Sequence, residues 1–292
     1  MRLNKNEIKT LLYITSSQSA VHPQDLINDL GVQRGSVSRI ITHLNEKGLV
    51  DREDNKLVLS ESKPAESFKR LYYAHRASPF QILLADGRID LISRLAKDPK
   101  SIKELQRETG IPLKTLYYYL QNLSRLSVVV KIKKGKGYLY SFNYLYWGAL
   151  KDFVSDLQEY DKVHLVPRDA LLIKIYDDSV LFKSLRQQDA TLTSFSAYGD
   201  YGIDLDLRDN YYTLPKRELS IKEIFIHSLD SAEGLQQKLF CILFYLKNKD
   251  ELEGIEHHMM NDIKTVLQGE KIKGYPSLED IEDRTEMYDI KL

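Results

Sequence analysis

Basic, amide and phenolic side chains recur at helical spacing between residues 114 and 125 of the 292-residue chain. Each residue of a helix turns the chain by about 100°, so a helix here would gather its leucines on one face. The opposite face would carry Lys114, Tyr118, Gln121 and Arg125, with Tyr117 at its boundary. Lysine and arginine pair with guanine or phosphate, glutamine pairs with adenine, and a tyrosine hydroxyl donates to phosphate. The segment therefore predicts a helix face that binds nucleic acid.

Four lysines follow in the segment KIKKGKG, whose glycines predict a hairpin turn at Gly135–Gly137. They are Lys131, Lys133, Lys134 and Lys136. At a hairpin tip beside a phosphate backbone, lysines contribute attraction that carries no sequence information. The alternative is a solvated strand edge whose lysines prevent pairing with another chain.

The helix and the hairpin belong to an internal repeat. Residues 25–50, DLINDLGVQRGSVSRIITHLNEKGLV, align without a gap to residues 104–129, ELQRETGIPLKTLYYYLQNLSRLSVV, at a constant offset of 79 residues. Gly31 aligns with Gly110, which suits the left-handed end of a helix. Each copy thus predicts two helices, a glycine stop, a third helix and a hairpin. The first hairpin turns near Asp54–Asn55.

This order of elements resembles the winged helix-turn-helix of the MarR/ArsR-type superfamily of transcription regulators. The resemblance covers about residues 4–60 and 79–143 and rests on DLGVQRGSVSRIITHLNEKGLV and ETGIPLKTLYYYLQNLSRLSVV. It implies that the third helix of each copy enters the major groove of double-stranded DNA. The implied contacts in the first copy are Arg34, Arg39, Thr42 and His43, beside Gly35.

The first copy departs from this pattern, because its hairpin segment DREDNK is acidic. Two arrangements are therefore open. In one, the two copies form a pseudo-dimer that covers an asymmetric DNA site with a single chain. In the other, the first copy serves in assembly, the chain forms a homodimer, and the site is palindromic.

The segment between the copies, about residues 63–78, is expected to be a linker with a short helix. It carries arginines and lysines among tyrosines: Lys63, Lys69, Arg70, Tyr72, Tyr73 and Arg76. Such a mixture suits nucleic acid, and a packed strut between domains is the equal alternative. The exposed tyrosines also leave single-stranded RNA open as a ligand.

The formal net charge of zero conceals a division of the chain. Residues 1–60 carry a net charge of +1, residues 61–150 carry +9 and residues 151–292 carry −10. This asymmetry indicates a half that binds a polyanion and a half that does something else. The second half predicts helices at 143–161, 219–229 and 234–250, a hairpin at 170–185, and a short helix followed by a strand at 191–207. Ser220 and Glu223 predict a capping box.

Residues 165–250 loosely resemble the C-terminal domain of AbiE-type abortive-infection antitoxins. The matching segments are SAYGDYGI, residues 196–203, and IKEIFIHSL, residues 221–229. The resemblance implies a protein that represses its own promoter and neutralises a nucleotidyltransferase-like toxin. This chain departs from that family in having two winged-helix copies where one is typical.

Catalytic signatures are weak in the second half. Asp204 and Asp206 alternate on the expected strand, which would place both carboxylates on one face, but no glycine-rich phosphate cradle accompanies them. Adjacent His257 and His258 point about 100° apart on a helix and make a poor metal pair. His227 lies among apolar residues, so we expect a core or boundary histidine with satisfied hydrogen bonds. We therefore expect no enzyme, no metal and no cofactor.

The sequence as a whole predicts an α+β protein with two tandem winged helices, residues 1–62 and 79–145, and a mixed α/β domain, residues 146–292. The start of the chain lacks an apolar signal region, and the apolar run at 239–246 is too short for a membrane span. The single cysteine, Cys241, fits a reducing compartment. We expect a cytoplasmic DNA-binding transcriptional regulator that contacts no membrane. Its C-terminal domain would bind a toxin or another protein, or sense an effector.

Overall fold

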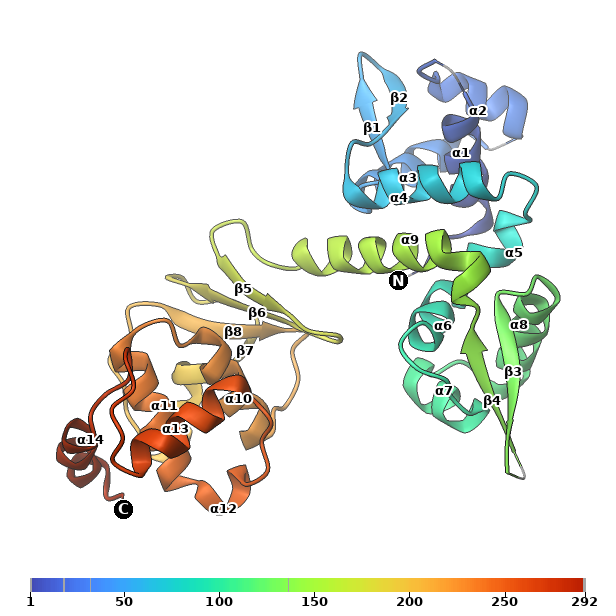
Figure 1. Ribbon diagram of the computed structural model, residues 1–292. Coiled ribbons are helices and arrows are strands. Elements are labelled where there is room, and N and C mark those ends of the chain that lie inside the picture. Colours follow the sequence, from blue (N-terminus) through green and yellow to red (C-terminus); the bar gives the residue numbers. More distant parts are fainter. Residues whose placement is uncertain (1, 18, 32, 136, 291–292) are drawn as a thin grey trace. The chain divides into compact units, whose positions relative to one another are not determined.

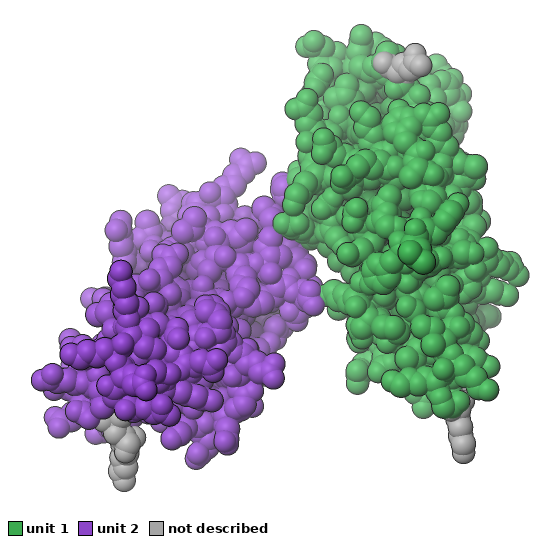
Figure 2. Space-filling model, viewed as in Figure 1, with its two compact units in different colours: residues 1–161 green, residues 162–292 purple. Residues whose placement is uncertain are grey.

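The computed structural model describes residues 2–17, 19–31, 33–135 and 137–290. The chain forms two compact units, Met1–Asp161 and Lys162–Leu292 (Figure 2). This division falls later than the expected domain boundary at residues 145 and 146. The residues between the two positions form most of a helix whose apolar stripe is buried in the first unit.

The first unit opens with three helices and a hairpin, which we call the first set. These elements are α1 (Lys5–Ser16), α2 (Pro23–Leu30), α3 (Arg34–Glu46), β1 (Val50–Glu53) and β2 (Lys56–Leu59). Asn4 and Glu7 form a capping box at the start of α1. Gly31 ends α2 with a φ of 63°, as the repeat predicts. Asp54 and Asn55 both have positive φ, which closes the two-residue turn of the hairpin.

The second set repeats this order. It consists of α6 (Arg88–Leu95), α7 (Ile102–Thr109), α8 (Leu113–Arg125), β3 (Val129–Lys134) and β4 (Gly137–Phe142). Ser101 caps α7, and Gly110 ends it with a φ of 65°. The β3–β4 hairpin has six residue pairs, whereas the β1–β2 hairpin has four. In Figure 1 the two hairpins extend toward opposite ends of the unit.

Three further helices join the sets: α4 (Lys63–Ala74), α5 (Phe80–Leu84) and α9 (Tyr144–Val163). The ring of Phe68 in α4 contacts Phe80 and Phe153, with centroids 6.0 and 5.2 Å apart. Further along α9, Gln158 accepts a 2.7 Å hydrogen bond from Ser93 of α6. Buried side chains of both sets therefore belong to one continuous core. The segment at 63–78 packs between the sets through Phe68, as the strut alternative predicts, while Lys69 and Arg70 remain exposed.

The second unit is a four-stranded antiparallel sheet covered by helices (Figure 1). The strand order is β5 (Leu171–Ile175), β6 (Val180–Ser184), β8 (Asn210–Leu214) and β7 (Thr191–Leu192). The helices are α10 (Ile221–Ser231), α11 (Leu235–Lys247), α12 (Lys249–Leu252), α13 (His258–Leu267) and α14 (Leu278–Thr285), with 3-10 turns η1 (Ser194–Tyr201) and η2 (Glu286–Tyr288). Phe244 stacks on Tyr198 at 4.0 Å in the core of this unit. Cys241 is buried in the same core.

One expected strand of the second unit was wrong. Residues 203–207 lie outside every strand, although buried Ile203 is followed by alternating half-buried and exposed residues. This alternation is typical of a strand. However, the apolar side chains after Gly202 pack on the helical core of the unit, and Ile203 N donates to Tyr198 O at 3.1 Å and not to a neighbouring strand. The ladder instead uses β7 and β8. The capping box of Ser220 and Glu223 is confirmed at the start of α10.

The helices of both units can be compared with the thickness of a bilayer. Within residues 2–290, apart from the gaps given above, no helix has both the length and the apolar character that a membrane span needs.

Candidate nucleic-acid interface

Helix α8 divides its side chains as the helical spacing predicts. Its buried face is Leu116, Tyr119, Leu120 and Leu123. Its exposed residues include Lys114, Tyr117, Tyr118, Gln121 and Arg125. The ring-bearing side chains among them are strongly exposed, at 51% for Tyr117 and 57% for Tyr118. Exposed tyrosines on an otherwise well-packed helix are typical of a binding surface.

A groove of about 750 Å³ lies between α8 and the β3–β4 hairpin. Its lining includes six of the predicted site residues, which are Lys114, Tyr117, Tyr118, Gln121, Arg125 and Lys131. Leu120, Ser124 and Tyr140 complete it. Among these described lining residues, three are cations and none is a carboxylate. The groove therefore has the charge and the hydrogen-bond donors that a phosphate backbone requires.

The hairpin brings lysine and tyrosine together on one face. Lys131 pairs with Tyr140 across the strands, and Lys133 pairs with Tyr138. The ammonium of Lys131 lies 4.3 Å from the ring centroid of Tyr138, close enough for a cation–π contact. Tyr138 and Tyr140 did not figure in the predicted site, although the alternation of lysine and tyrosine in the hairpin contained the signal.

The outer lysines of the hairpin are placed differently. Lys133 and Lys134 are exposed beyond the groove lining. Lys134 faces away from Lys131 and Lys133, because successive strand residues alternate in direction. Lys136, the fourth lysine of the predicted cluster, lies outside the described residues.

Arg88 lies against the buried side of α8, behind the groove, and no feature of the sequence indicated this position. Its side chain is almost fully buried, and its guanidinium lies 4.1 Å from the ring centroid of Tyr119 and 5.8 Å from that of Tyr118. Nη1 donates to Ala85 O at 2.9 Å and lies 3.3 Å from Asp86 Oδ2. Arg88 precedes α8 by 25 residues, so helical periodicity cannot connect the two.

The predicted site residues of the first set lie on α3 and are separate from this groove. Arg34, Arg39, Thr42 and His43 are all exposed. A β-carbon added at Gly35 would meet open space, so the backbone there is accessible. However, His43 Nδ1 lies 3.0 Å from Oε1 of the buried Glu7. The imidazole is thus already engaged by a carboxylate.

The hairpin of the first set is acidic and is linked to its own helix. Asp51, Glu53 and Asp54 are its acidic residues. Asn45 of α3 donates from Nδ2 to Asp51 Oδ1 at 3.0 Å. These three carboxylates outnumber Arg52 and Lys56, so this hairpin attracts phosphate less than the lysine-bearing β3–β4 hairpin does.

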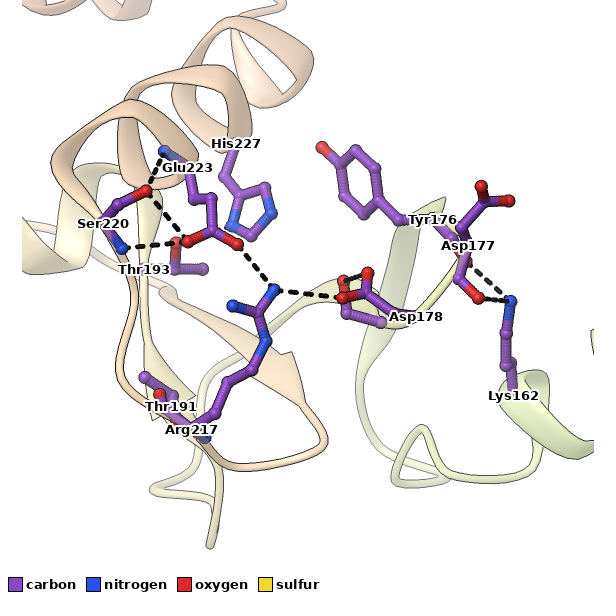
Figure 3. A network of polar contacts seen from close by, with 11 residues as sticks. Lys162, Tyr176, Asp177, Asp178, Thr191, Thr193, Arg217, Ser220, Glu223 and His227 are labelled. Carbon is purple, nitrogen blue, oxygen red and sulfur yellow. Dashed lines mark hydrogen bonds and ion pairs between the residues drawn. The ribbon is translucent and has the colours of Figure 1, made fainter. Parts of the chain in front are cut away.

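The second unit contains a polar network around Arg217 (Figure 3). Arg217 Nη2 lies 2.7 Å from Glu223 Oε1 and 3.6 Å from Asp178 Oδ2. Partial burial raises the pKa of Glu223, but hydrogen bonds from Arg217 and Ser220 outweigh it and lower this pKa to about 2. Burial lowers the pKa of His227 to about 4, so its imidazole is neutral at pH 7. His227 Nδ1 lies 2.7 Å from Thr193 Oγ1, as expected for a satisfied core histidine.

The other residues considered for chemistry in this unit are not assembled into a metal site. Asp204 and Asp206 are exposed, and His257 Nε2 lies 3.4 Å from Asp230 Oδ1. Lys174 and Tyr176 also donate to Asp230. In the described part of the chain, no group of three histidine, cysteine or acidic residues has the geometry to hold a metal ion.

A family model matches part of the chain. Residues 3–57 match the family model described as MarR family, which spans α1 to the start of β2. No curated protein and no solved structure matches the chain. The match indicates a winged helix of MarR type at the first set, and with it a DNA-binding transcriptional regulator. The second set and the second unit lie outside the matched residues.

Proposed function

We propose that the protein is a transcriptional regulator in which both sets are winged helices and the second set makes the main contacts with duplex DNA. The observation that carries this proposal is the groove between α8 and the β3–β4 hairpin. The groove combines three cations with the exposed tyrosines of α8. In the repeat, α8 corresponds to α3, which lies inside the segment that matches the MarR family.

In this proposal α8 enters the major groove, and the hairpin lies against the neighbouring phosphate backbone. Gln121 and Lys114 reach base edges, because amide and ammonium groups on an exposed helix face can pair with adenine and guanine. Lys131 and Arg125 neutralise phosphates, and the hydroxyls of Tyr117 and Tyr118 donate to phosphate oxygens.

The first set has a smaller role in DNA binding. Its α3 presents Arg34 and Arg39, but the acidic β1–β2 hairpin opposes approach of the phosphate backbone. Its main contribution is the core that it shares with the second set.

Selection of duplexes from a random-sequence pool by the full-length protein tests this function. We expect enrichment of a defined duplex motif, with an affinity that falls steeply as salt is raised. Single-stranded RNA and DNA of equal length serve as competitors. Tighter binding of single-stranded RNA than of any selected duplex would identify the tyrosine-lined groove as an RNA site instead.

For the second unit, we propose a role in protein interaction or effector sensing, without catalysis. Its supporting features are a separate hydrophobic core and the net negative charge of residues 162–292. Neutralisation of a nucleotidyltransferase-like toxin is the specific form that the resemblance to AbiE-type antitoxins suggests. Co-expression with such a toxin encoded beside this gene would test it: restored growth supports the role, and unchanged toxicity removes it.

A further inference from the structure

The N-terminal segment of the first set is hydrogen-bonded to the second set. Leu3 is fully buried and forms isolated β-bridges with Ala85 and Asp86, just before α6. Asp86 N donates to Leu3 O at 2.9 Å. Asp86 has a φ of 60°, so the chain makes a tight turn at the point of contact. The position of this turn therefore depends on the first set.

The same turn holds Arg88. Ala85 O accepts a hydrogen bond from Arg88 Nη1, and the carboxylate of Asp86 lies within reach of the same nitrogen. Arg88 Nε has no hydrogen-bond partner in the described part of the chain. The orientation of the guanidinium is thus set by contacts with the turn on one side and by aromatic rings on the other.

Those rings belong to α8. The guanidinium lies over Tyr119, which is buried, and its second neighbour is Tyr118, which lines the groove. The two rings are themselves 6.0 Å apart. A delocalised planar cation can stack on a ring in a way that a lysine ammonium cannot reproduce. Arg88 therefore contacts the Tyr118 and Tyr119 rings from the protein interior, while Tyr118 remains exposed to solvent.

A second series of contacts runs from Leu3 into the exposed face of α3. Asn4 N donates to Glu7 Oε2 at 2.8 Å, and the other oxygen of Glu7 lies 3.0 Å from His43 Nδ1. Glu7 is buried, so this carboxylate has little alternative solvation. The exposed faces of α3 and α8 are thus connected through residues 3–7 and 85–88.

We propose that Arg88 is a positioning residue for DNA recognition, which fixes Tyr118 in the groove and ties its placement to the Glu7–His43 contact of the first set. This inference rests on the proposed function of the groove. The first set would then contribute to recognition without contacting DNA itself, because it positions the groove residues of the second set.

The test is Arg88→Lys in the full-length protein, which retains the charge and removes the planar stacking group. We expect the affinity for the selected duplex to fall roughly three- to tenfold, because a lysine ammonium does not reproduce the planar contact of the guanidinium with the rings. Arg70→Lys, the same exchange on the exposed side of α4, is the matched control and should bind like the parent. Thermal unfolding confirms that each variant is folded.

A double-mutant cycle with Tyr118→Phe and Tyr118→Ala distinguishes positioning from a general structural effect. If Arg88 acts through the Tyr118 ring, Arg88→Lys should weaken binding in the parent and in Tyr118→Phe but not in Tyr118→Ala. Independent effects, in which the two losses multiply, would overturn the proposal. So would unchanged binding by a folded Arg88→Lys protein.

A readout without DNA separates this inference from the proposed function. The ring NMR signals of labelled Tyr118 should shift in Arg88→Lys and, by a smaller amount, in His43→Ala, which removes the contact with Glu7. Thr42→Ala, its neighbour on the exposed face of α3, is the control and should leave them unchanged. If the protein binds no duplex but these shifts occur, the proposed function fails and the positioning role stands. Unshifted Tyr118 signals in Arg88→Lys would remove the positioning role whatever the protein binds.

Discussion

The first and second sets of the first unit have the same order of elements, but the surfaces at their third helices carry different charged groups. Gly31 and Gly110 end their second helices in the same left-handed conformation. Beyond that shared backbone, α8 faces a groove with three cations, whereas α3 has an imidazole held by Glu7 and an acidic hairpin. Two sets with the same backbone order can therefore present different chemistry, because the side chains on the outer face of the third helix decide what it can bind.

The hairpins show the same contrast on a smaller scale. The β3–β4 hairpin is longer and carries Lys131 and Lys133 opposite tyrosines. In the β1–β2 hairpin, Asp51 accepts a hydrogen bond from Asn45 of its own third helix. The longer hairpin thus leaves Lys133 exposed, whereas the shorter one has one of its carboxylates bonded within its own set.

The largest effect is expected from Phe153→Ala in α9, which tests whether the two sets unfold as one unit. Phe153 is fully buried against Phe68 in the core that both sets share. We expect the free energy of unfolding of the first unit to fall by about 3–5 kcal/mol, as is typical for truncation of a buried phenylalanine. Urea unfolding, followed by hydrogen exchange in each set, should show both sets opening together.

Phe225→Ala in the second unit is the matched control, because Phe225 is equally buried in a different core. It should leave the exchange of α3 and α8 unchanged. Loss of protection in only one set of the Phe153→Ala protein would mean that the two sets are independent domains.

The next largest effect is expected from removal of charge on the β3–β4 hairpin. Replacing Lys131, Lys133 and Lys134 by alanine should weaken binding to all duplexes by roughly 100-fold near physiological salt, with little change in sequence preference. The slope of log K against log salt should decrease by about 0.9 for each phosphate that is no longer neutralised. Fluorescence anisotropy titrations at several salt concentrations measure both quantities.

The charge-matched control replaces Arg34, Arg39 and Lys47 of the first set by alanine. Because the acidic hairpin of that set disfavours phosphate, we expect a much smaller decrease in affinity. Equal decreases in the two triple variants would show that both sets contact the backbone and that one chain spans an asymmetric site.

Local signals in the sequence predicted much of this contrast. The glycine stops, the exposed face of α8 and the capping box of Ser220 and Glu223 each depend on residues within a few positions of one another. The acidic character of the first hairpin needs only composition. Such features are set by backbone sterics and by periodicity, so a single sequence contains them.

Contacts between distant segments could not be predicted in this way. That α9 completes the core of the first unit depends on Phe153 meeting Phe68, 85 residues earlier. The stacking of Arg88 on Tyr119 and the hydrogen bond between Leu3 and Asp86 are of the same kind. The alternation of Asp204 and Asp206 with apolar residues predicted a strand, because periodicity indicates which side chains are covered and not whether a neighbouring strand is available to pair.

A finer test concerns base recognition by α8. Gln121→Ala should lose about 1–3 kcal/mol of discrimination between the selected motif and a variant with one changed base pair, because the amide can pair with only one base edge. Affinity for unrelated duplexes should hardly change. Thr42→Ala on α3 is the matched exchange in the first set and should leave discrimination intact. Competition titrations against single-substitution duplexes decide whether Gln121 reads a base or only lines the groove.

The smallest effect is expected from Arg39→Ala, and this variant bears most directly on the first set. Arg39 is exposed on α3, inside the segment that matches the MarR family, and the resemblance to winged helix-turn-helix regulators implies that it contacts DNA. We expect less than about a threefold loss of affinity, the range of a single exposed charge interaction. The reason is that the acidic β1–β2 hairpin keeps phosphate away from this helix.

Footprinting, together with the mass of the complex, completes the measurement. A palindromic footprint occupied by two chains and unaffected by Arg39→Ala leaves α8 as the reader. A loss of tenfold or more, on an asymmetric footprint covered by one chain, would instead make α3 a reader of equal rank and reverse the comparison drawn from the charges.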